Sequence, residues 1–503
     1  MTNPLYDRLF GRHAGRDTPF LHLPDGGSLT HAAFLALAAH HAHALNAFGL
    51  GPGDRLAVQV EKSPEALALY AACLQAGVIF LPLNTAYTPA ELSYFIGDSG
   101  ARLVICDGRR MGALTPVAEA AGAHIATLNT DGSGSFAVIA ATKSAIYPTV
   151  ARDPDDLAAL LYTSGTTGRS KGAMLSQRNL LSNAEVLTEA WRFTEDDVLL
   201  HALPIFHTHG LFVATNIMLL AGGAMILLPK FDIDAVIAAL PRATAMMGVP
   251  TFYTRLLDDP RFDRALAAHI RLFVSGSAPL LAETHRAFEA RTGHRILERY
   301  GMTETNMSTS NPYDGERIAG TVGLPLPGVE LRIADPATRA ECSPGETGQI
   351  EVRGPNVFQG YWQMPDKTRE ELCEDGFFLT GDLGAIDAKG YVRIVGRAKD
   401  LIISGGLNVY PKEIEEVLDA QPGVLESAVI GVPHPDLGEA VLAVLVPAPG
   451  ETPELQAIAG SVATQLAGFK RPKRLELIEA LPRNAMGKVQ KAALRESYRD
   501  SFA

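Results

Sequence analysis

A buried strand that ends in a glycine-rich loop constrains this chain more than any other feature. Residues 157–162 form an apolar run that predicts the strand, and residues 163–172 continue as Thr-Ser-Gly-Thr-Thr-Gly-Arg-Ser-Lys-Gly. Glycines let the backbone approach an anion closely, and backbone N–H groups, hydroxyls and a lysine supply hydrogen-bond donors. The pattern predicts a loop that binds polyphosphate, with a flexible surface turn as the alternative.

The loop differs from the Walker sequence of many nucleotide-binding proteins. That pattern ends in Gly-Lys-Ser/Thr, whereas here Lys171 precedes Gly172. Helical spacing resumes only at Asn179, so the loop is expected between a strand and a helix. The residues expected to contact phosphate are Thr163, Ser164, Gly165, Thr166, Thr167, Gly168 and Lys171.

Composition and charge argue against two classes of partner. The 503 residues carry a formal net charge of −12, which argues against nucleic acid and requires locally placed cations for an anionic substrate. The most apolar stretch, residues 217–228, is broken by Gly222 and Gly223 and is too short to span a bilayer. No secretory segment is evident at residues 1–10, and four widely spaced cysteines indicate reduced thiols. We expect a cytoplasmic protein without membrane contact.

The rhythm of apolar segments predicts an α/β fold. Residues 30–130 alternate Ala-rich helical segments with short strands, and a second set of strands and helices lies between residues 197 and 275. Two helix-covered sheets are therefore expected in a large N-terminal domain, residues 1–396. Within it, residues 320–396 consist of short alternating segments between Gly/Pro turns, which predicts antiparallel strands or a small β-barrel-like subdomain.

The last hundred residues predict a second, smaller domain. Helical spacing at residues 413–418, apolar strands around residues 441–446 and a final helix near residues 492–498 are typical of an α+β unit. Its boundary is expected at residues 397–400, which taken alone are an ordinary solvated charge run. The C-terminal domain would then comprise residues 401–503.

Two peptides at expected strand ends carry groups suited to a binding pocket. Residues 203–210, Leu-Pro-Ile-Phe-His-Thr-His-Gly, hold His207 and His209, which can hydrogen-bond a carboxylate or be ordinary loop histidines. No third ligand for a metal is evident beside them. Residues 275–279, Ser-Gly-Ser-Ala-Pro, can hold a nucleotide base or serve as a plain helix N-cap.

Residues 298–304, Glu-Arg-Tyr-Gly-Met-Thr-Glu, are equally informative. Tyr300 offers a ring to stack on a base, Gly301 allows close approach, and Thr303 can donate to a phosphate. Glu304 can bind Mg²⁺, which takes few protein carboxylates alongside phosphate oxygens and water.

In this order along the chain, these peptides resemble the motifs of the acyl-adenylate-forming superfamily, which includes acyl-CoA synthetases, luciferases and peptide-synthetase adenylation domains. That family usually has Pro before the loop lysine, and Ser170 stands there in this chain without removing a phosphate donor. The resemblance implies an α/β fold of a large N-terminal domain and a small mobile C-terminal lid. It also implies ATP and coenzyme A as co-substrates, with Mg²⁺ as cofactor.

The resemblance further implies roles for matching positions. Asp382 would bind the ribose, Lys399 would be the hinge about which the lid rotates, and Lys488 would be the catalytic lysine of adenylation. Mg²⁺ would be held by Glu304, with Thr163 or Thr166. The catalytic set is Lys488, Glu304, Lys171 and His207. Coenzyme A would contact Ser404, Gly405 and Gly406. The nucleotide would also contact Ser277, Ala278, Glu298, Tyr300, Gly301, Met302, Thr303, Asp382, Arg397 and Lys488.

Arg299 narrows the expected substrate. The peptide Glu-Arg-Tyr-Gly-Met-Thr-Glu resembles the malonyl-CoA synthetases within this family. A second, non-reacting carboxylate in a desolvated pocket needs a compensating charge, and a guanidinium can receive it in a forked geometry. Arg299, His207 and Ser277 would bind this carboxylate. The alternatives are that Arg299 pairs with Glu298, with a phosphate or with water.

The expected reaction is ATP-dependent ligation of malonate, a small dicarboxylate, to coenzyme A through a malonyl-adenylate. The alternatives are a coenzyme A ligase for methylmalonate, oxalate or a monocarboxylate, and a free-standing adenylation domain that loads a carrier protein. Acylation of Lys488 by a lysine acyltransferase would delete its charge and switch the enzyme off.

Overall fold

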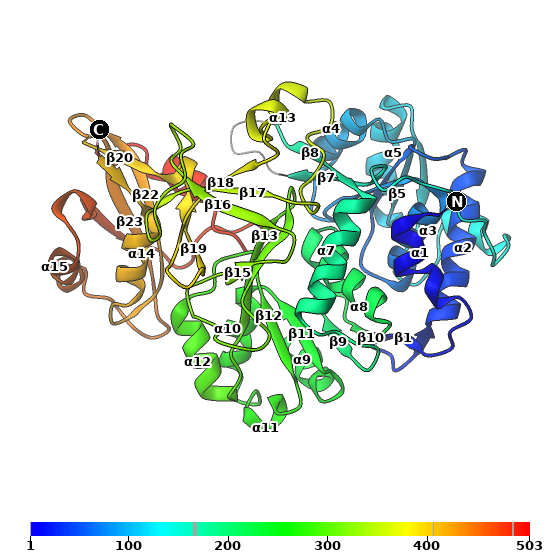
Figure 1. The fold of residues 1–503 in the computed structure, drawn as a ribbon, viewed down its shortest axis with the longest axis horizontal. Helices are drawn as coiled ribbons and strands as arrows, with labels where there is room; N and C mark the ends of the chain where they lie inside the picture. The colour runs from blue at the N-terminus through cyan, green and yellow to red at the C-terminus, as the bar shows by residue number, and fades with distance from the viewer. Residues whose placement is uncertain (1, 164–168, 406, 485–486, 503) are drawn as a thin grey trace. The chain divides into compact units, whose positions relative to one another are not determined.

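The computed structural model describes residues 2–163, 169–405, 407–484 and 487–502. The chain divides into two compact units, which we call the large unit (Met1–Glu330 with Val352–Phe378) and the small unit (Leu331–Glu351 with Leu379–Ala503). The α/β fold class, with a large N-terminal part and a smaller C-terminal part, is confirmed (Figure 1). The hinge expected at residues 397–400 is not tested by this division and stays a prediction.

The first sheet of the large unit has six strands in the order β6-β5-β3-β4-β7-β8, and all neighbours are parallel except β7 and β8. Its strands are near-continuous apolar runs because helices cover both faces of a parallel sheet. Their bounds are β3 Arg55–Gln59, β4 Ile79–Pro82, β5 Leu103–Cys106, β6 His124–Thr127, β7 Leu157–Thr163 and β8 Lys171–Ser176.

The second sheet has nine strands in the order β15-β14-β13-β12-β11-β9-β10-β1-β2. Neighbours from β13 to β1 are parallel, and the pairs at the two ends are antiparallel. The bounds are β1 Pro19–His22, β2 Ser28–Thr30, β9 Val198–His201, β10 Ala224–Leu227, β11 Ala245–Gly248, β12 Leu272–Ser275, β13 Leu297–Met302, β14 Asn306–Ser310 and β15 Leu324–Pro325.

Capping residues fix the helices between these strands. Helix α3 begins after Ser63, whose side chain accepts from the N–H of Ala66, and ends at Gly77 in the left-handed conformation. Helix α7 contacts β8 of one sheet and β14 of the other, so it lies between them (Figure 1). The large-unit helices are α1 Pro4–Leu9, α2 His31–Ala47, α3 Pro64–Ala76, α4 Pro89–Ser99, α5 Met111–Ala120, α6 Ser135–Ala141, α7 Gln177–Ala190, α8 Asn216–Ala221, α9 Ile233–Ala239, α10 Pro250–Asp258, α11 Arg264–Ala267, α12 Ala282–Thr292 and α13 Pro365–Glu371, with a π-helix, η3, at His209–Thr215.

The strand before the glycine-rich loop and the helical segment after it are confirmed as β7 and α7, but strand β8, which begins at Lys171 and pairs antiparallel with β7, was not expected. One local expectation for the large unit is wrong. Residues 275–279 do not cap a helix. Ser277 has φ 71°, a left-handed conformation that no α-helix contains, and α12 begins only at Ala282 without a side-chain cap.

The small unit contains most of a four-stranded sheet, in the order β16-β17-β18-β19, and a five-stranded sheet with the path β21-β20-β23-β22 and β24 beside β23. Ile414 and Leu418 of α14 pack with Val429 and Val441 of the five-stranded sheet in one apolar core. The bounds are β16 Glu330–Ala334, β17 Gly348–Arg353, β18 Phe378–Ile386, β19 Val392–Arg397, β20 Ile402–Ser404, β21 Leu407–Val409, β22 Val424–His434, β23 Gly438–Pro447, β24 Arg474–Leu477, α14 Pro411–Asp419, α15 Leu455–Gln465 and α16 Lys491–Ser497. None of the helices in the described ranges has the length and hydropathy needed to cross a lipid bilayer.

Candidate active site

The β7–β8 pair fixes both ends of the glycine-rich loop. Thr163 ends β7, Lys171 begins β8, and the two residues are partners in the strand register. The Thr163 hydroxyl lies 3.4 Å from Oε1 of Glu304. The loop positions Ser164, Gly165, Thr166, Thr167 and Gly168, all expected to bind phosphate, lie outside the described residues.

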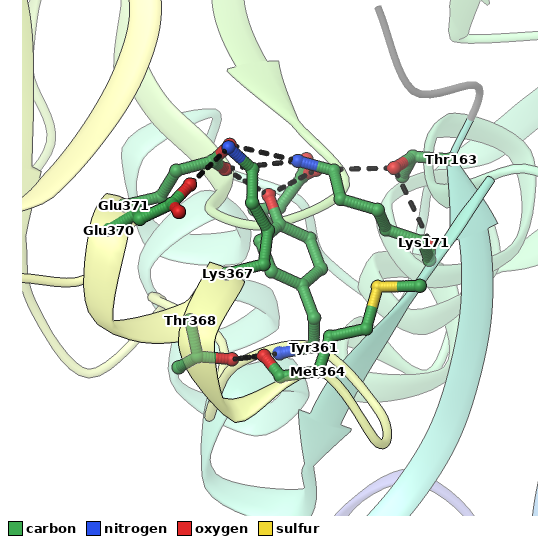
Figure 2. Close-up of polar contacts among 9 residues, drawn as sticks. Thr163, Lys171, Tyr361, Met364, Lys367, Thr368, Glu370 and Glu371 are labelled. Carbon is green, nitrogen blue, oxygen red and sulfur yellow. Dashed lines mark hydrogen bonds and ion pairs between the residues drawn. The ribbon is translucent and has the colours of Figure 1, made fainter. Parts of the chain in front are cut away.

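A network of charged groups adjoins the loop (Figure 2). Lys171 Nζ donates to both carboxylate oxygens of Glu371, at 3.0 and 3.1 Å, and lies 4.1 Å from the centre of the Tyr361 ring. The Tyr361 hydroxyl lies 2.6 Å from Glu371 Oε2 and 3.1 Å from Glu304 Oε1, so it stands between two carboxylates. Lys367, one turn before Glu371 on α13, pairs with the same carboxylate at 3.0 Å.

Burial and hydrogen bonding set the charges in this network. Burial and the two neighbouring carboxylates raise the pKa of Tyr361, so its hydroxyl stays protonated and can donate. Burial opposes ionisation of Glu371, but hydrogen bonds from Tyr361, Lys171 and Lys367 outweigh it, and the pKa of Glu371 is lowered. Two ammonium groups, those of Lys171 and Lys367, and the ionised Glu371 carboxylate therefore lie together in this network.

Arg299 is a buried cation on β13, the third strand of the second sheet. It is 3% exposed, so bulk water does not solvate it. Its Nε and Nη2 find no hydrogen-bond partner among the described residues. A Cβ on Gly276 would lie 2.4 Å from Arg299 Cζ, so the guanidinium packs directly on the Gly276 backbone. Burial lowers the pKa of Arg299 to about 9.

His209 and Ser277 lie near this guanidinium, and the three side chains are together called the Arg299 pocket below. The Ser277 hydroxyl lies 3.2 Å from His209 Nδ1, and His209 Nε2 is buried without a partner among the described residues. Burial, followed by the charge of Arg299, holds the pKa of His209 well below its usual value, so the imidazole is neutral. The Ser277–His209 hydrogen bond uses one proton of this pair, so the three side chains offer the guanidinium donors and one further donor, from either the imidazole or the hydroxyl, a set that suits a carboxylate.

His207 lies beside this pocket, and its Nδ1 accepts from the backbone N–H of His209 at 3.3 Å. The structure thus brings His209 against Ser277, although the sequence pattern favoured His207. The role expected of His207 in substrate binding stays a prediction.

The rest of the 298–304 peptide lies on β13 and in the turn after it. Glu298 is buried, and its Oε1 accepts from the backbone N–H of Leu280 at 3.2 Å. A Cβ on Gly301 would lie 1.9 Å from the Asn306 carbonyl oxygen, so this position requires glycine. The remaining expected nucleotide contacts of the large unit, all partly exposed, are Ala278, Tyr300, Met302 and Thr303.

The expected residues of the small unit lie on its strand ends and turns. Asp382 and Arg397 form an ion pair at 2.6 Å across β18 and β19. Lys399 lies in the 3₁₀-turn Ala398–Asp400, and burial lowers its pKa. Ser404 and Gly405 stand where β20 turns towards β21, and Gly406 lies outside the described residues.

The turn that carries Lys488 is closed by Asn484. The Asn484 N–H donates to the Lys488 carbonyl at 2.9 Å, and the Lys488 N–H donates to Asn484 Oδ1 at 3.0 Å. Arg483 donates to the Gly487 carbonyl at 2.6 Å and pairs with Glu426 on β22. These contacts fix the backbone that presents Lys488.

Two helix-covered sheets, a glycine-rich loop beside a carboxylate, and a smaller unit with a lysine-bearing turn are features of an adenylate-forming enzyme. The chain belongs to the AMP-binding enzyme family, which it matches over residues 11–362, and residues 413–488 match the AMP-binding enzyme C-terminal domain. It is therefore an AMP-forming acid–coenzyme A ligase with ATP and coenzyme A as substrates. The family and enzyme class expected from the sequence are confirmed.

The chain is similar over nearly its whole length to solved and curated relatives. ATP-bound MatB from Rhodopseudomonas palustris is 55% identical, with a TM-score of 0.98 and coverage of 100% of both chains. A sulfoacetate–CoA ligase from Cupriavidus necator is 37% identical over 95% of this chain and 94% of its own length. A malonate–CoA ligase from Arabidopsis thaliana is 35% identical over 90% of this chain and 79% of its own length.

Proposed function

We propose that the protein ligates malonate to coenzyme A through a malonyl-adenylate, giving malonyl-CoA, AMP and pyrophosphate. The observation that carries this is the buried Arg299 guanidinium, whose Nε and Nη2 are without partners among the described residues. A monocarboxylate would leave these donors desolvated and unpaired, whereas the second carboxylate of a short diacid satisfies them. The names of two relatives, a malonate–CoA ligase and a sulfoacetate–CoA ligase, also denote short acids with a second anionic group.

In the first half-reaction the free carboxylate of malonate attacks the α-phosphorus of ATP, and pyrophosphate leaves. Arg299, His209 and Ser277 hold the other carboxylate, so the diacid enters in one orientation. Lys171 and the loop hold the departing phosphates, and the Lys488 ammonium offsets charge that develops between the carboxylate and the α-phosphate. Asp382 binds the ribose, and Arg397 contacts the ribose or a phosphate.

In the second half-reaction the coenzyme A thiol attacks the acyl carbon, and AMP leaves with the electron pair of the broken acyl–phosphate bond. Ser404 and Gly405 line the thiol arm, and the small unit turns about Lys399 between the two steps. In this sequence Lys488 acts in adenylate formation, and the Gly405 turn acts in thioester formation.

The Glu304 site fits Mg²⁺. Glu304 is 4% exposed, and its carboxylate has the Thr163 hydroxyl at 3.4 Å and the Tyr361 hydroxyl at 3.1 Å. No group of three His, Cys, Asp or Glu side chains suited to a metal exists in the described part of the chain, so phosphate oxygens and water would supply most ligands. Bound Mg²⁺ would neutralise phosphate charge.

Two further parts of the proposal concern the cell. Acylation of Lys488 by a lysine acyltransferase would remove its charge and block adenylation. Mass spectrometry of protein from cells, with activity measured before and after deacylation, tests this point. A cytoplasmic compartment stays a prediction that rests on the four separated cysteines.

A panel of acids tests the substrate. AMP release is measured with malonate, methylmalonate, oxalate and propionate, each with and without coenzyme A. We expect the highest kcat/KM with malonate and full turnover only with coenzyme A. Equal use of propionate would contradict the diacid pocket, and activity that depends on a carrier protein instead of coenzyme A would favour the adenylation-domain alternative.

A further inference from the structure

A buried lysine outside the site described above has only uncharged partners. Lys62, between β3 and α3, is 7% exposed, and its Nζ lies 2.7 Å from His201 Nδ1, 2.7 Å from the His201 carbonyl and 3.0 Å from the Leu203 carbonyl. Three acceptors match the three N–H bonds of an ammonium group. No carboxylate among the described residues pairs with Lys62, and burial lowers its pKa well below the usual value.

The contacts of His201 fix the direction of a hydrogen-bond chain. His201 ends β9, and its Nε2 lies 2.8 Å from the Gly210 carbonyl. Only a ring protonated at Nε2 can donate to that carbonyl, which leaves Nδ1 free to accept from Lys62. Burial and the nearby charge of Lys62 keep the pKa of His201 well below its usual value, so the ring is neutral.

This hydrogen-bond chain ends at Gly210, one residue from His209 of the Arg299 pocket. Gly210 belongs to the π-helix His209–Thr215, a conformation that often occurs at functional sites, and its carbonyl also accepts from the Thr215 hydroxyl at 2.9 Å. A Cβ on Gly210 would lie 2.0 Å from the Pro204 carbonyl oxygen, so the backbone packs tightly there. His209, the preceding residue, faces Ser277.

We propose that Lys62 is a positioning residue for the diacid pocket: its ammonium orients His201, which holds the Gly210 carbonyl and so keeps His209 beside Ser277 and Arg299. This inference rests on the proposed function. An apolar side chain of similar length would fill the same volume without burying a charge, so packing alone does not account for the lysine.

The test compares KM values for malonate and ATP in malonate-dependent ATP–pyrophosphate exchange. Lys62→Met and His201→Ala each interrupt the hydrogen-bond chain. Each should raise the malonate KM about ten-fold or more, while the ATP KM stays within about two-fold of the wild-type value. His201→Gln should stay within about three-fold, because the amide can accept from Lys62 and donate to Gly210. Lys230→Met, at an exposed lysine of the same unit, is the control and should match wild type.

Two results would overturn the inference while the proposed function stands. The first is a folded Lys62→Met protein with an unchanged malonate KM. The second is an equal malonate KM for His201→Ala and His201→Gln, a comparison that tests the inference even if Lys62→Met does not fold. A purely structural role would lower kcat through the active fraction and leave KM unchanged. The absence of malonate-dependent exchange in wild type would instead overturn the proposed function, and this inference with it.

Discussion

At the scale of single residues, the site depends on the close approach of the Gly276 backbone to the Arg299 guanidinium. Gly276 leaves room for the Arg299 guanidinium, since a Cβ there would lie 2.4 Å from Cζ. We expect Gly276→Ala to displace the guanidinium and lower kcat/KM for malonate at least about ten-fold while the ATP KM changes little. Gly112→Ala, where a Cβ meets open space, is the matched control. Unchanged malonate kinetics in Gly276→Ala would contradict the packing of Arg299 on this backbone.

Asp419, the last residue of α14, provides a pH test of stability. Burial raises its pKa from 3.8 to about 6, and it accepts a hydrogen bond from Ser427 at 2.7 Å. The folded state then binds more protons than the unfolded state between these two values, so stability falls as pH rises through that window. Asp419→Asn should raise the Tm by roughly 2–4 °C at neutral pH and have no effect below about pH 4. A Tm difference independent of pH would refute this account.

At the scale of elements, helix α13 acts through the charged network beside the loop. Lys171 and Lys367 share the Glu371 carboxylate, and the Tyr361 hydroxyl joins Glu371 to Glu304 (Figure 2). If Lys171 binds a phosphate as proposed, Lys367 would remain to neutralise Glu371. Helix α13 would then allow Lys171 to exchange the carboxylate for the nucleotide.

Removal of the Tyr361 hydroxyl tests this arrangement. Tyr361→Phe leaves two carboxylates without their shared donor, at a cost of about 1–3 kcal/mol, so we expect the ATP KM to rise roughly ten-fold. The malonate KM should stay near its wild-type value because the diacid pocket is formed by other residues. Tyr147→Phe, at a partly buried tyrosine of the same unit, serves as control. An equal rise of both KM values would indicate general disruption instead.

Elements set by local patterns were predicted well, and contacts between distant residues were not. The apolar runs of β3, β5 and β12 and the helical spacing of α3 identify those elements within one or two residues of their bounds. Strand β8 was missed because its six residues form a strand through pairing with β7, which local spacing does not reveal. Arg299 was found because its motif is contiguous. Glu371 was missed because it lies 200 residues from Lys171, and no local signal marks such a pair.

At the scale of the whole molecule, the chemistry is divided between two units. The phosphate loop and the Arg299 pocket belong to the large unit, whereas Lys488 and the Gly405 turn belong to the small unit. Under the proposed function, both half-reactions need groups from each unit. The proposed rotation about Lys399 would present Lys488 and the Gly405 turn in sequence.

Substitution of Lys488 separates the two half-reactions. Lys488→Ala should reduce malonyl-adenylate formation by about a hundred-fold or more, because no other group is proposed to bridge the carboxylate and the α-phosphate. Thioester formation from preformed malonyl-adenylate should remain near the wild-type rate. Single-turnover assays of each step measure this, with Lys473→Ala at an exposed lysine as control. Equal loss of both steps would contradict the division of labour.

The central claim is that a buried guanidinium selects a diacid, and Arg299→Leu tests it most directly. The measurement is kcat/KM for malonate and for propionate in wild type, in Arg299→Leu and in the exposed control Arg295→Leu. The variant should lose about 2–5 kcal/mol of malonate recognition while propionate use is unchanged or improved, because the desolvated cation no longer excludes an apolar tail. Malonate kinetics in Arg299→Leu that equal those of Arg295→Leu would contradict the account.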